Sequence, residues 1–294
     1  MAIDGLEGEK SASERFPGAL HTYTYESMMS NGWALQSCTS HLLSQDFMRE
    51  FEVSYQDKEG KQAHPYYTSW GASTRLLGAL ISSHSDNRGL VIPPKMSEYV
   101  ATLLPLYAND EAGVREYTDT IAETLLGKNN DIPVQGQYFR ARINTKNQKL
   151  LLDARDVRLG EKINDWELSG YPIRIEYGPR DMAQSQVVVA DRILGEKHIT
   201  PISDLKKMTE TLLEKGQEAL LEKSRNRLQK IQLYATMKQI SQQLLKLGNL
   251  HSMHGMVTRN SKHISKQPTR RQHAVCHLQD SLRMSSCLKS KKGK

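Results

Sequence analysis

Hydrophobic and polar residues alternate along parts of the first 85 residues. The run "HTYTYESM" (residues 21–28) alternates β-branched or aromatic residues with polar ones, which is typical of a half-buried strand. Residues 51–70 contain two further strand-like runs around a turn at residues 58–61. Between them, "TSHLLSQDFMREF" (residues 39–51) predicts a short helix whose buried side carries Leu42, Leu43, Phe47 and Phe51. We therefore expect an antiparallel sheet with packed helices in residues 1–85.

The hydrophobic pattern changes after Pro93 and Pro94. Apolar strand-like runs then alternate with amphipathic helical runs, which favours an α/β domain with a largely buried sheet. The expected strands are residues 101–107, 149–156, 171–178 and 185–192, and the expected helices are residues 110–127 and 161–170. A long helix should follow from Ser203 to about Leu247, because leucines recur there at helical spacing.

These patterns divide the chain into four predicted regions. Residues 1–92 form the α+β region, 93–200 the α/β domain, 201–247 a helical extension, and 248–294 a basic tail that we expect to be disordered. Residues 235–294 hold twelve Lys or Arg and one acid, a net charge of +11, although the whole chain carries only +7. The body is therefore mildly acidic, and a nucleic-acid site in it must come from local placement of charge.

Composition limits the class of protein further. The three cysteines make no paired framework, and no run reaches the roughly 18 apolar residues of a membrane span. The first 16 residues lack the apolar core of a signal peptide. A reduced, cytoplasmic protein without membrane contact is the expectation.

One arginine has an unusual place in the pattern. Arg75 follows Ser73 by two residues and begins a predicted helix. The apolar residues Leu76, Leu77, Leu80 and Ile81 recur there at helical spacing, which predicts a buried helix. A strand is expected directly afterwards, at residues 89–94. A cation at the start of a helix opposes the helix dipole unless an anion is also present. Alternatively, Arg75 pairs with a nearby carboxylate.

Several segments together resemble one enzyme family. They are "FPGALHTYTYE", "ALQSCTSHLLSQDF", "TSWGASTRLLGALISSHSDNRGLVIPP", "WELSGYPIRIEYGPRD" and "QVVVADRILGEK". In this order they resemble the prolyl-tRNA synthetases, of the eukaryote-like type of this class II aminoacyl-tRNA synthetase. The resemblance implies a remnant of the class II catalytic sheet in residues 1–92 and an anticodon-binding domain in residues 93–200.

The resemblance assigns roles to residues of the first region. Gly71, Ser73 and Arg75 would form motif 3, with Arg75 on the ATP γ-phosphate, and Ser73, Gln36 and Thr39 would lie near ATP. His41 and Trp70 would line the proline pocket. Without the resemblance, the pattern favours a partly buried structural histidine at His41 and an ordinary core aromatic at Trp70. Ser37 and Cys38 stand where the family has glycines, at a point where backbone approaches the ligand.

The implied reaction joins proline to tRNA(Pro) through a prolyl-adenylate, with ATP and Mg²⁺ as cofactors. Positioning and stabilisation of phosphate charge supply the catalysis, so the binding residues are the catalytic ones, Arg75 foremost. Three family features have no counterpart in the chain: motif 1, which makes the family's homodimer, the Thr-x-Glu loop, and motif 2. We therefore expect an N-terminally truncated synthetase.

The segment "LLLDARDVRLGEKINDWELSG" resembles the part of the family that contacts anticodon bases. Asp153, Arg155 and Lys162 become base-contact candidates, because charged forks can distinguish guanine edges. Trp166 and Leu168 are expected in the core. The alternative is a solvated surface helix with incidental charges. Residues 129–149 look inserted relative to the family.

The basic tail departs from the family, which ends in a zinc-associated domain. The tail has histidines and two cysteines but no CxxC pair, so we expect no metal site. Three hypotheses stay open: a truncated proline–tRNA ligase, a noncatalytic tRNA-binding paralogue, and an incomplete gene product.

Overall fold

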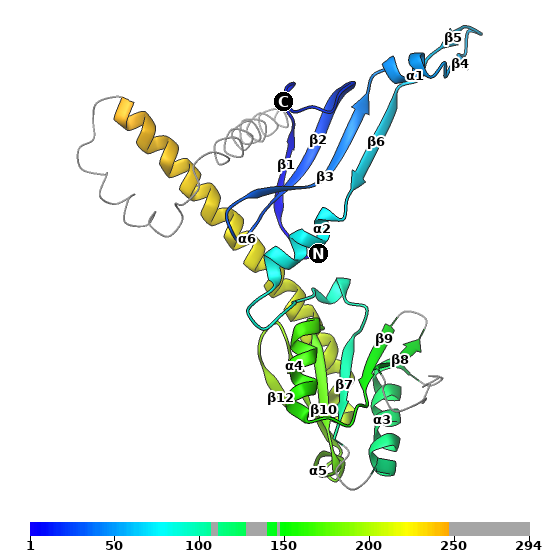
Figure 1. Ribbon diagram of the computed structural model, residues 1–294, viewed down its shortest axis with the longest axis vertical. Coiled ribbons are helices and arrows are strands. Elements are labelled where there is room, and N and C mark those ends of the chain that lie inside the picture. Colours follow the sequence, from blue (N-terminus) through cyan, green and yellow to red (C-terminus); the bar gives the residue numbers. More distant parts are fainter. Residues whose placement is uncertain (107–110, 128–139, 146–147, 247–294) are drawn as a thin grey trace, which may run out of the picture. The chain divides into compact units, whose positions relative to one another are not determined.

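The computed structural model describes residues 1–106, 111–127, 140–145 and 148–246 of the chain, and these form two compact units (Figure 1). The antiparallel unit consists of Asp4–Ala79 together with the chain from Ser224, and the mixed-sheet unit consists of Met1–Ile3 and Leu80–Lys223. The predicted basic tail, residues 248–294, lies outside the described residues, as does most of the expected insertion at 129–149.

The antiparallel unit is built on one four-stranded sheet in the order β1-β2-β3-β6. Its strands are β1 (Gly5–Glu9), β2 (Ala19–Met28), β3 (Ala34–Leu43) and β6 (Tyr67–Ala72). A small hairpin of β4 (Tyr55–Gln56) and β5 (Gln62–Ala63) turns at the expected place, where Gly60 has φ +80°. The helices of this part are α1 (Asp46–Glu50) and α2 (Arg75–His84). The predicted antiparallel sheet is thus present.

The helix predicted over residues 39–51 is wrong in its first half. Residues 39–43 belong to β3, which pairs with β2 on one side and with β6 on the other, and only Asp46–Glu50 is helical. Leu43 is buried, but Phe51 is 70% exposed. Pairing with two neighbouring strands overrides a helical pattern that is only a few residues long.

The mixed-sheet unit has a six-stranded sheet in the order β12-β11-β10-β7-β9-β8 (Figure 1). The strands are β7 (Ala101–Pro105), β8 (Arg140–Thr145), β9 (Gln148–Asp153), β10 (Ile173–Tyr177), β11 (Gln186–Asp191) and β12 (Lys197–Pro201). Strands β10, β7 and β9 are parallel to one another, whereas β8, β11 and β12 pair antiparallel at the two edges. The α/β architecture expected here is confirmed.

Helices lie on both faces of this sheet. They are α3 (Glu111–Leu126), α4 (Leu159–Ser169), the short α5 (Pro179–Met182) and α6 (Leu205–Lys246), with 3₁₀ turns at Pro94–Met96 and Ile202–Asp204. Leu103, Ile175 and their neighbours on one face pack with α3 and with the first part of α6. Trp166 of α4 packs on the other face, where the guanidinium of Arg174 lies 4.5 Å from the centre of its ring. The core therefore includes the start of α6, beyond the boundary expected at residue 200.

The strand expected at residues 89–94 is replaced by an extended segment bound to the end of α4. The Leu90 and Ile92 amides donate to the carbonyls of Leu168 and Gly170. Gly170 has φ +74°, and a Cβ there would lie 2.5 Å from the Leu90 backbone, so only glycine fits. Prolines at 93 and 94 have no amide with which to extend a strand ladder.

Two smaller expectations about burial are also corrected. Leu168 is exposed, although its neighbour Trp166 is buried as expected. Helix α2 begins at Arg75 as expected, but Leu77 and Ile81 are exposed, so this helix is only partly buried. Within the described residues, no helix combines the length and the hydrophobicity that a membrane crossing requires.

Candidate functional site

A charged cluster lies at the carboxyl end of β9, facing α4. Two oxygens of Asp153 receive hydrogen bonds from Arg155, from Nε at 2.7 Å and from Nη2 at 2.6 Å. The same Nη2 lies 2.8 Å from the carboxylate of Asp165 on α4. Two carboxylates from two elements therefore hold one guanidinium, a geometry that fixes its plane.

This arrangement sets the ionisation of its members. Burial alone would raise the pKa of Asp153, but the hydrogen bond and charge of Arg155 outweigh burial and lower that pKa. Hydrogen bonding to Asp153 raises the pKa of Arg155. Both groups are therefore ionised at neutral pH. Nη1 of Arg155 has no hydrogen-bond partner among the residues the structure describes, and a fifth of the side chain is exposed.

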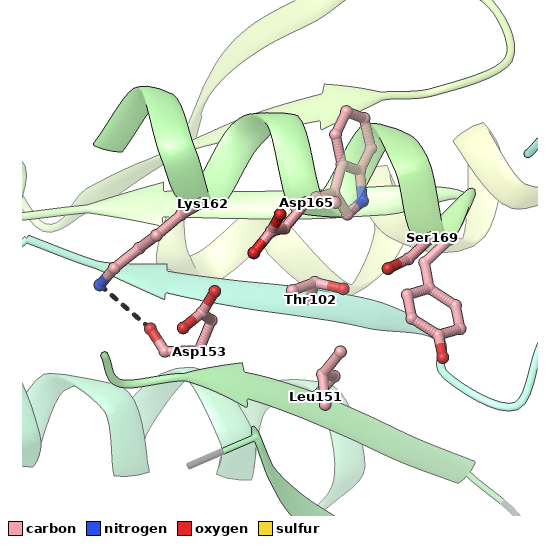
Figure 2. Close-up of a pocket in the computed structure, with 8 residues that line it drawn as sticks. Thr102, Leu151, Asp153, Lys162, Asp165 and Ser169 are labelled. Carbon is pink, nitrogen blue, oxygen red and sulfur yellow. Dashed lines mark hydrogen bonds between the residues drawn. The ribbon is translucent and has the colours of Figure 1, made fainter. Parts of the chain in front are cut away.

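Lys162 lies beside this cluster but points into the protein (Figure 2). Its ammonium donates to the carbonyls of Pro105 and Asp153, both at 3.1 Å, and the residue is only 3% exposed. Burial lowers the pKa of Lys162, while the Asp153 carboxylate acts in the opposite direction. The two carbonyls belong to the last residues of the parallel strands β7 and β9, so Lys162 ties these strand ends together.

Figure 2 shows the pocket that continues from this cluster beneath α4. Asp153 and Asp165 line one part, and Thr102 and Ser169 line the other. The net charge of Asp153, Asp165, Arg155 and Lys162 is zero, so the cluster has no surplus of positive charge for a phosphate. It suits a neutral partner with hydrogen-bond acceptors, such as the edge of a base.

In the antiparallel unit, the register gathers three predicted site residues on one face of the sheet. Thr39 and His41 alternate along β3, and a bulge at Ser37 brings Gln36 to the same face, opposite Glu26 of β2. His41 Nδ1 lies 3.0 Å from the hydroxyl of Thr22. The structure thus brings Gln36, Thr39 and His41 together.

Arg75 reaches the same strand from the start of α2. Its Nη1 donates to the carbonyl of Gln36 at 3.4 Å, and its amide donates to the hydroxyl of Ser73 at 3.3 Å. The Gln36 side chain accepts a hydrogen bond from Lys10 Nζ at 2.5 Å. Two cations, Arg75 and Lys10, therefore meet at Gln36.

The register separates Trp70 from His41, although both were predicted for one proline pocket. Trp70 pairs with Ser40, whereas His41 pairs with Ser69, so the two side chains project from opposite faces of the sheet. Trp70 is 75% exposed. As described, this sheet gives the two residues no shared pocket.

The side chains that replace the family's glycines also lie on the far face. Cys38 pairs with Tyr25 and Ala72, and the Ser37 hydroxyl is bonded to that of Ser27 at 2.9 Å. Gln36, Thr39 and His41 occupy the other face. Their face of the sheet is therefore not obstructed by these two substitutions.

Sequence reasoning missed Asp165, Lys10 and Glu26. Asp165 could have been found, because it follows Lys162 by three residues and so lies on the same side of α4. Lys10 and Glu26 become neighbours of Gln36 only through strand pairing, which the pattern of a single strand does not specify.

Comparisons with known proteins show what the mixed-sheet unit is similar to. Residues 102–212, which cover β7 to the start of α6, match a family described as an anticodon binding domain. The mixed-sheet unit is thus similar to an anticodon binding domain, and the α/β class predicted for it is confirmed.

The relatives that the chain matches are named as proline–tRNA ligases. The chain is 40% identical over 205 residues to proline–tRNA ligase 2 of Clostridioides difficile, covering 70% of this chain and 39% of the relative. It is 40% identical to proline–tRNA ligase of Mycoplasma mobile over 221 residues (75% and 42%), and 41% identical to that of Bdellovibrio bacteriovorus over 199 residues (67% and 37%). The predicted resemblance to prolyl-tRNA synthetases is confirmed, over about two fifths of the relatives' length. The eukaryote-like type stays a prediction.

Proposed function

We propose that this chain is part of a proline–tRNA ligase and that its mixed-sheet unit binds the anticodon of tRNA(Pro). The observation that carries the proposal is Arg155, held by Asp153 and Asp165 in a domain that matches an anticodon-binding family. A guanidinium fixed by two carboxylates loses little side-chain entropy when it binds a base edge.

The three predicted contact residues would then have different roles. Arg155 would donate from Nη1 to a base acceptor, and Asp153 would hold the guanidinium in place. Lys162 would have to leave two carbonyls before it could reach a base, which is costly for a buried ammonium. We therefore assign Lys162 to fixing the strand ends from which Asp153 and Arg155 project.

The same proposal gives the antiparallel unit a part in adenylate formation. Arg75 would bind the γ-phosphate of ATP, with Gln36 and Thr39 nearby and His41 toward proline; Ser73 orients the first amide of α2. Mg²⁺ prefers carboxylate and phosphate oxygens. Glu26, opposite Gln36, is the carboxylate that the register supplies next to this face, and it would hold the ion together with the phosphates.

The anticodon proposal is tested with tRNA(Pro) and an anticodon-swapped tRNA. Arg155→Gln should reduce the discrimination between the two tRNAs by about 1.5–3 kcal/mol, the value of one hydrogen bond from a charged donor. Arg158→Gln is the matched control, because Arg158 is an exposed arginine just ahead of α4. Equal weakening for both tRNAs in the Arg155 variant would make this residue a phosphate contact and would contradict its assignment.

The adenylate proposal is tested by proline-dependent ATP–pyrophosphate exchange. The chain should be preceded by the N-terminal catalytic segment of the Clostridioides difficile relative, so that the family's remaining motifs are present. Arg75→Ala should then lower exchange by about 2.7–4 kcal/mol of transition-state stabilisation, as removal of one preorganised donor to developing charge does. Unchanged exchange activity in the Arg75→Ala variant would show that Arg75 does not bind ATP and would contradict its assignment.

A second candidate is tRNA binding without catalysis. It is favoured by the separation of Trp70 and His41, because a proline pocket with both residues does not form on this sheet. Discrimination between the two tRNAs, without exchange in the extended chain, would support this candidate over the ligase.

A further inference from the structure

The face of the mixed sheet beneath α4 carries a buried hydroxyl. Successive side chains of β7 point to opposite faces, so Thr102 faces α4 while Leu103 packs with the core on the other side. Thr102 is 3% exposed, and its Oγ1 has no hydrogen-bond partner among the residues that the structure describes. Buried hydroxyls are rarely left unpaired, because the unmade bond costs free energy. This hydroxyl therefore indicates a position where a small polar ligand would be stabilised.

A second buried polar group belongs to the same place. Trp166 of α4 is 4% exposed, and its Nε1 has no acceptor within the described part of the chain. Its ring lies over the guanidinium of Arg174, and Arg174 is the residue of β10 that pairs with Thr102. Thr102 and Trp166 both line the pocket beneath α4, together with Asp165 and Ser169 (Figure 2). One unpaired group on the sheet and one on the helix therefore share a pocket.

The size of the pocket limits what can occupy it. Its interior has a volume of about 10 Å³. One water molecule needs a cavity of roughly 10–15 Å³ by this measure, so the interior holds one water. A nucleobase, a sugar or a hydrated metal ion is far larger than this space. The ligand of the interior is therefore of the size of a single water molecule.

The chemistry of the lining selects a neutral ligand that both accepts and donates hydrogen bonds. The indole N–H of Trp166 can only donate, so the ligand must accept. An ammonium or a bare cation cannot accept from an N–H group. An anion would be repelled by the carboxylates of Asp153 and Asp165, which line the same pocket. Water accepts and donates, and the Thr102 hydroxyl can take either role toward it.

We propose that the pocket beneath α4 is a binding site for one ordered water molecule, which accepts a hydrogen bond from Trp166 Nε1 and bonds to the hydroxyl of Thr102. The water joins α4 to β7 and satisfies both buried groups. A buried water with such partners is part of the structure and is costly to remove. The water site does not depend on the proposed function, although α4 also carries Asp165, which holds Arg155.

The first test makes the same change at two buried threonines of the mixed-sheet unit. Thr102→Val removes the hydroxyl in the pocket and nearly preserves the shape of the side chain. Thr209→Val on α6 is the matched control. Thr209 is 1% exposed and its hydroxyl also lacks a partner among the described residues, but it does not line this pocket. Chemical denaturation of the full chain, followed at the indole N–H signal of Trp166, reports on the mixed-sheet unit, because Trp33 and Trp70 belong to the antiparallel unit.

The sign of the change in stability distinguishes a hydrated pocket from a dry one. With the water bound, Thr102→Val should raise the equilibrium constant of unfolding about five- to thirtyfold, because the water loses a partner and no longer satisfies the N–H of Trp166. In a dry pocket the hydroxyl is unpaired, so its removal should leave the stability unchanged or increase it, as we expect for Thr209→Val. A Thr102→Val variant as stable as the wild type, or an equal loss in the Thr209→Val variant, would overturn the proposal.

The second test observes the ligand directly, in crystal structures of the wild type, Thr102→Ser and Thr102→Val at a resolution that shows ordered water. The wild type and Thr102→Ser, which keeps the hydroxyl, should show one water within about 2.7–3.2 Å of Trp166 Nε1 and of the hydroxyl at position 102. Thr102→Val should lack this water. An empty pocket in the wild type, or the same water in the Thr102→Val variant, would overturn the proposal. Neither test uses RNA, so failure of the anticodon proposal leaves both outcomes unchanged.

Discussion

The two sheets of this protein bury their side chains to different degrees. In the mixed-sheet unit, Leu103, Ile175 and Val189 are completely buried, because helices cover both faces. On the antiparallel sheet, Tyr23 and Trp70 are exposed, and few apolar residues reach a core. Apolar residues on a strand therefore stabilise a unit only where a second layer covers them. Among the described residues, the mixed-sheet unit has that layer on both faces.

The largest expected effect concerns where the mixed-sheet unit ends. A fragment of residues 80–223 should unfold cooperatively in denaturant, whereas a fragment ending at residue 200 should lose several kcal/mol. The second fragment lacks the buried Leu205 and Leu212, and each buried leucine contributes about 2–5 kcal/mol. Equal unfolding midpoints for the two fragments would show that the start of α6 is not part of this core.

A pair of single substitutions tests the contrast in burial directly. Ile175→Ala should destabilise the protein by about 2–5 kcal/mol, because it removes buried methyl groups from the centre of the sheet. Leu77→Ala on the exposed side of α2 should cost less than about 0.5 kcal/mol. Chemical denaturation, monitored by circular dichroism, measures both. Similar costs at the two positions would contradict the difference in burial.

An ion pair between a buried arginine and a partly exposed carboxylate gives a third test within the mixed-sheet unit. The fully buried guanidinium of Arg192 donates to both carboxylate oxygens of Asp86, at 2.7 and 2.8 Å. Asp86→Asn should cost about 3 kcal/mol, at the low end for a broken buried pair, because the carboxylate is partly exposed and water can replace it. Arg88→Gln on the same loop should cost less than about 1 kcal/mol, since Arg88 forms surface ion pairs with Glu167 and Asp86. Equal losses of the free energy of unfolding in the two variants would show that the burial of Arg192 does not determine the strength of its ion pair.

The same pair predicts a smaller, pH-dependent effect. Hydrogen bonding to Arg192 holds the pKa of Asp86 well below its ordinary value. A carboxyl with a lowered folded-state pKa stabilises the fold above its unfolded pKa of about 3.9, and that stabilisation is lost as the pH falls further. The stability difference between the wild type and Asp86→Asn should therefore be constant from pH 5 to 7 and shrink below about pH 4. A difference that does not change down to pH 2 would contradict this linkage.

Local pattern predicted most elements of the mixed-sheet unit. The helix that ends at Gly170 and the strands around Leu103 and Ile175 occur where they were predicted. The signals used were the periodicity of apolar residues and the glycine at the end of the helix, and both act within a few residues of the element. The pattern failed at residues 39–43 and 89–94. There, pairing with β2 and β6, and hydrogen bonds to the end of α4, decided the conformation through residues distant in sequence.

The sequence by itself determined the kinds of element, the residue types at both candidate sites and the resemblance to prolyl-tRNA synthetases. Tertiary structure alone decided which side chains meet. Strand register places Trp70 and His41 on opposite faces, since a shift of one residue reverses the face of every side chain. Packing of α4 against the sheet brings Asp165 to Arg155 and buries Lys162 against two strand ends. These contacts depend on pairing and packing between distant segments, whereas local signals report only on the segment that carries them.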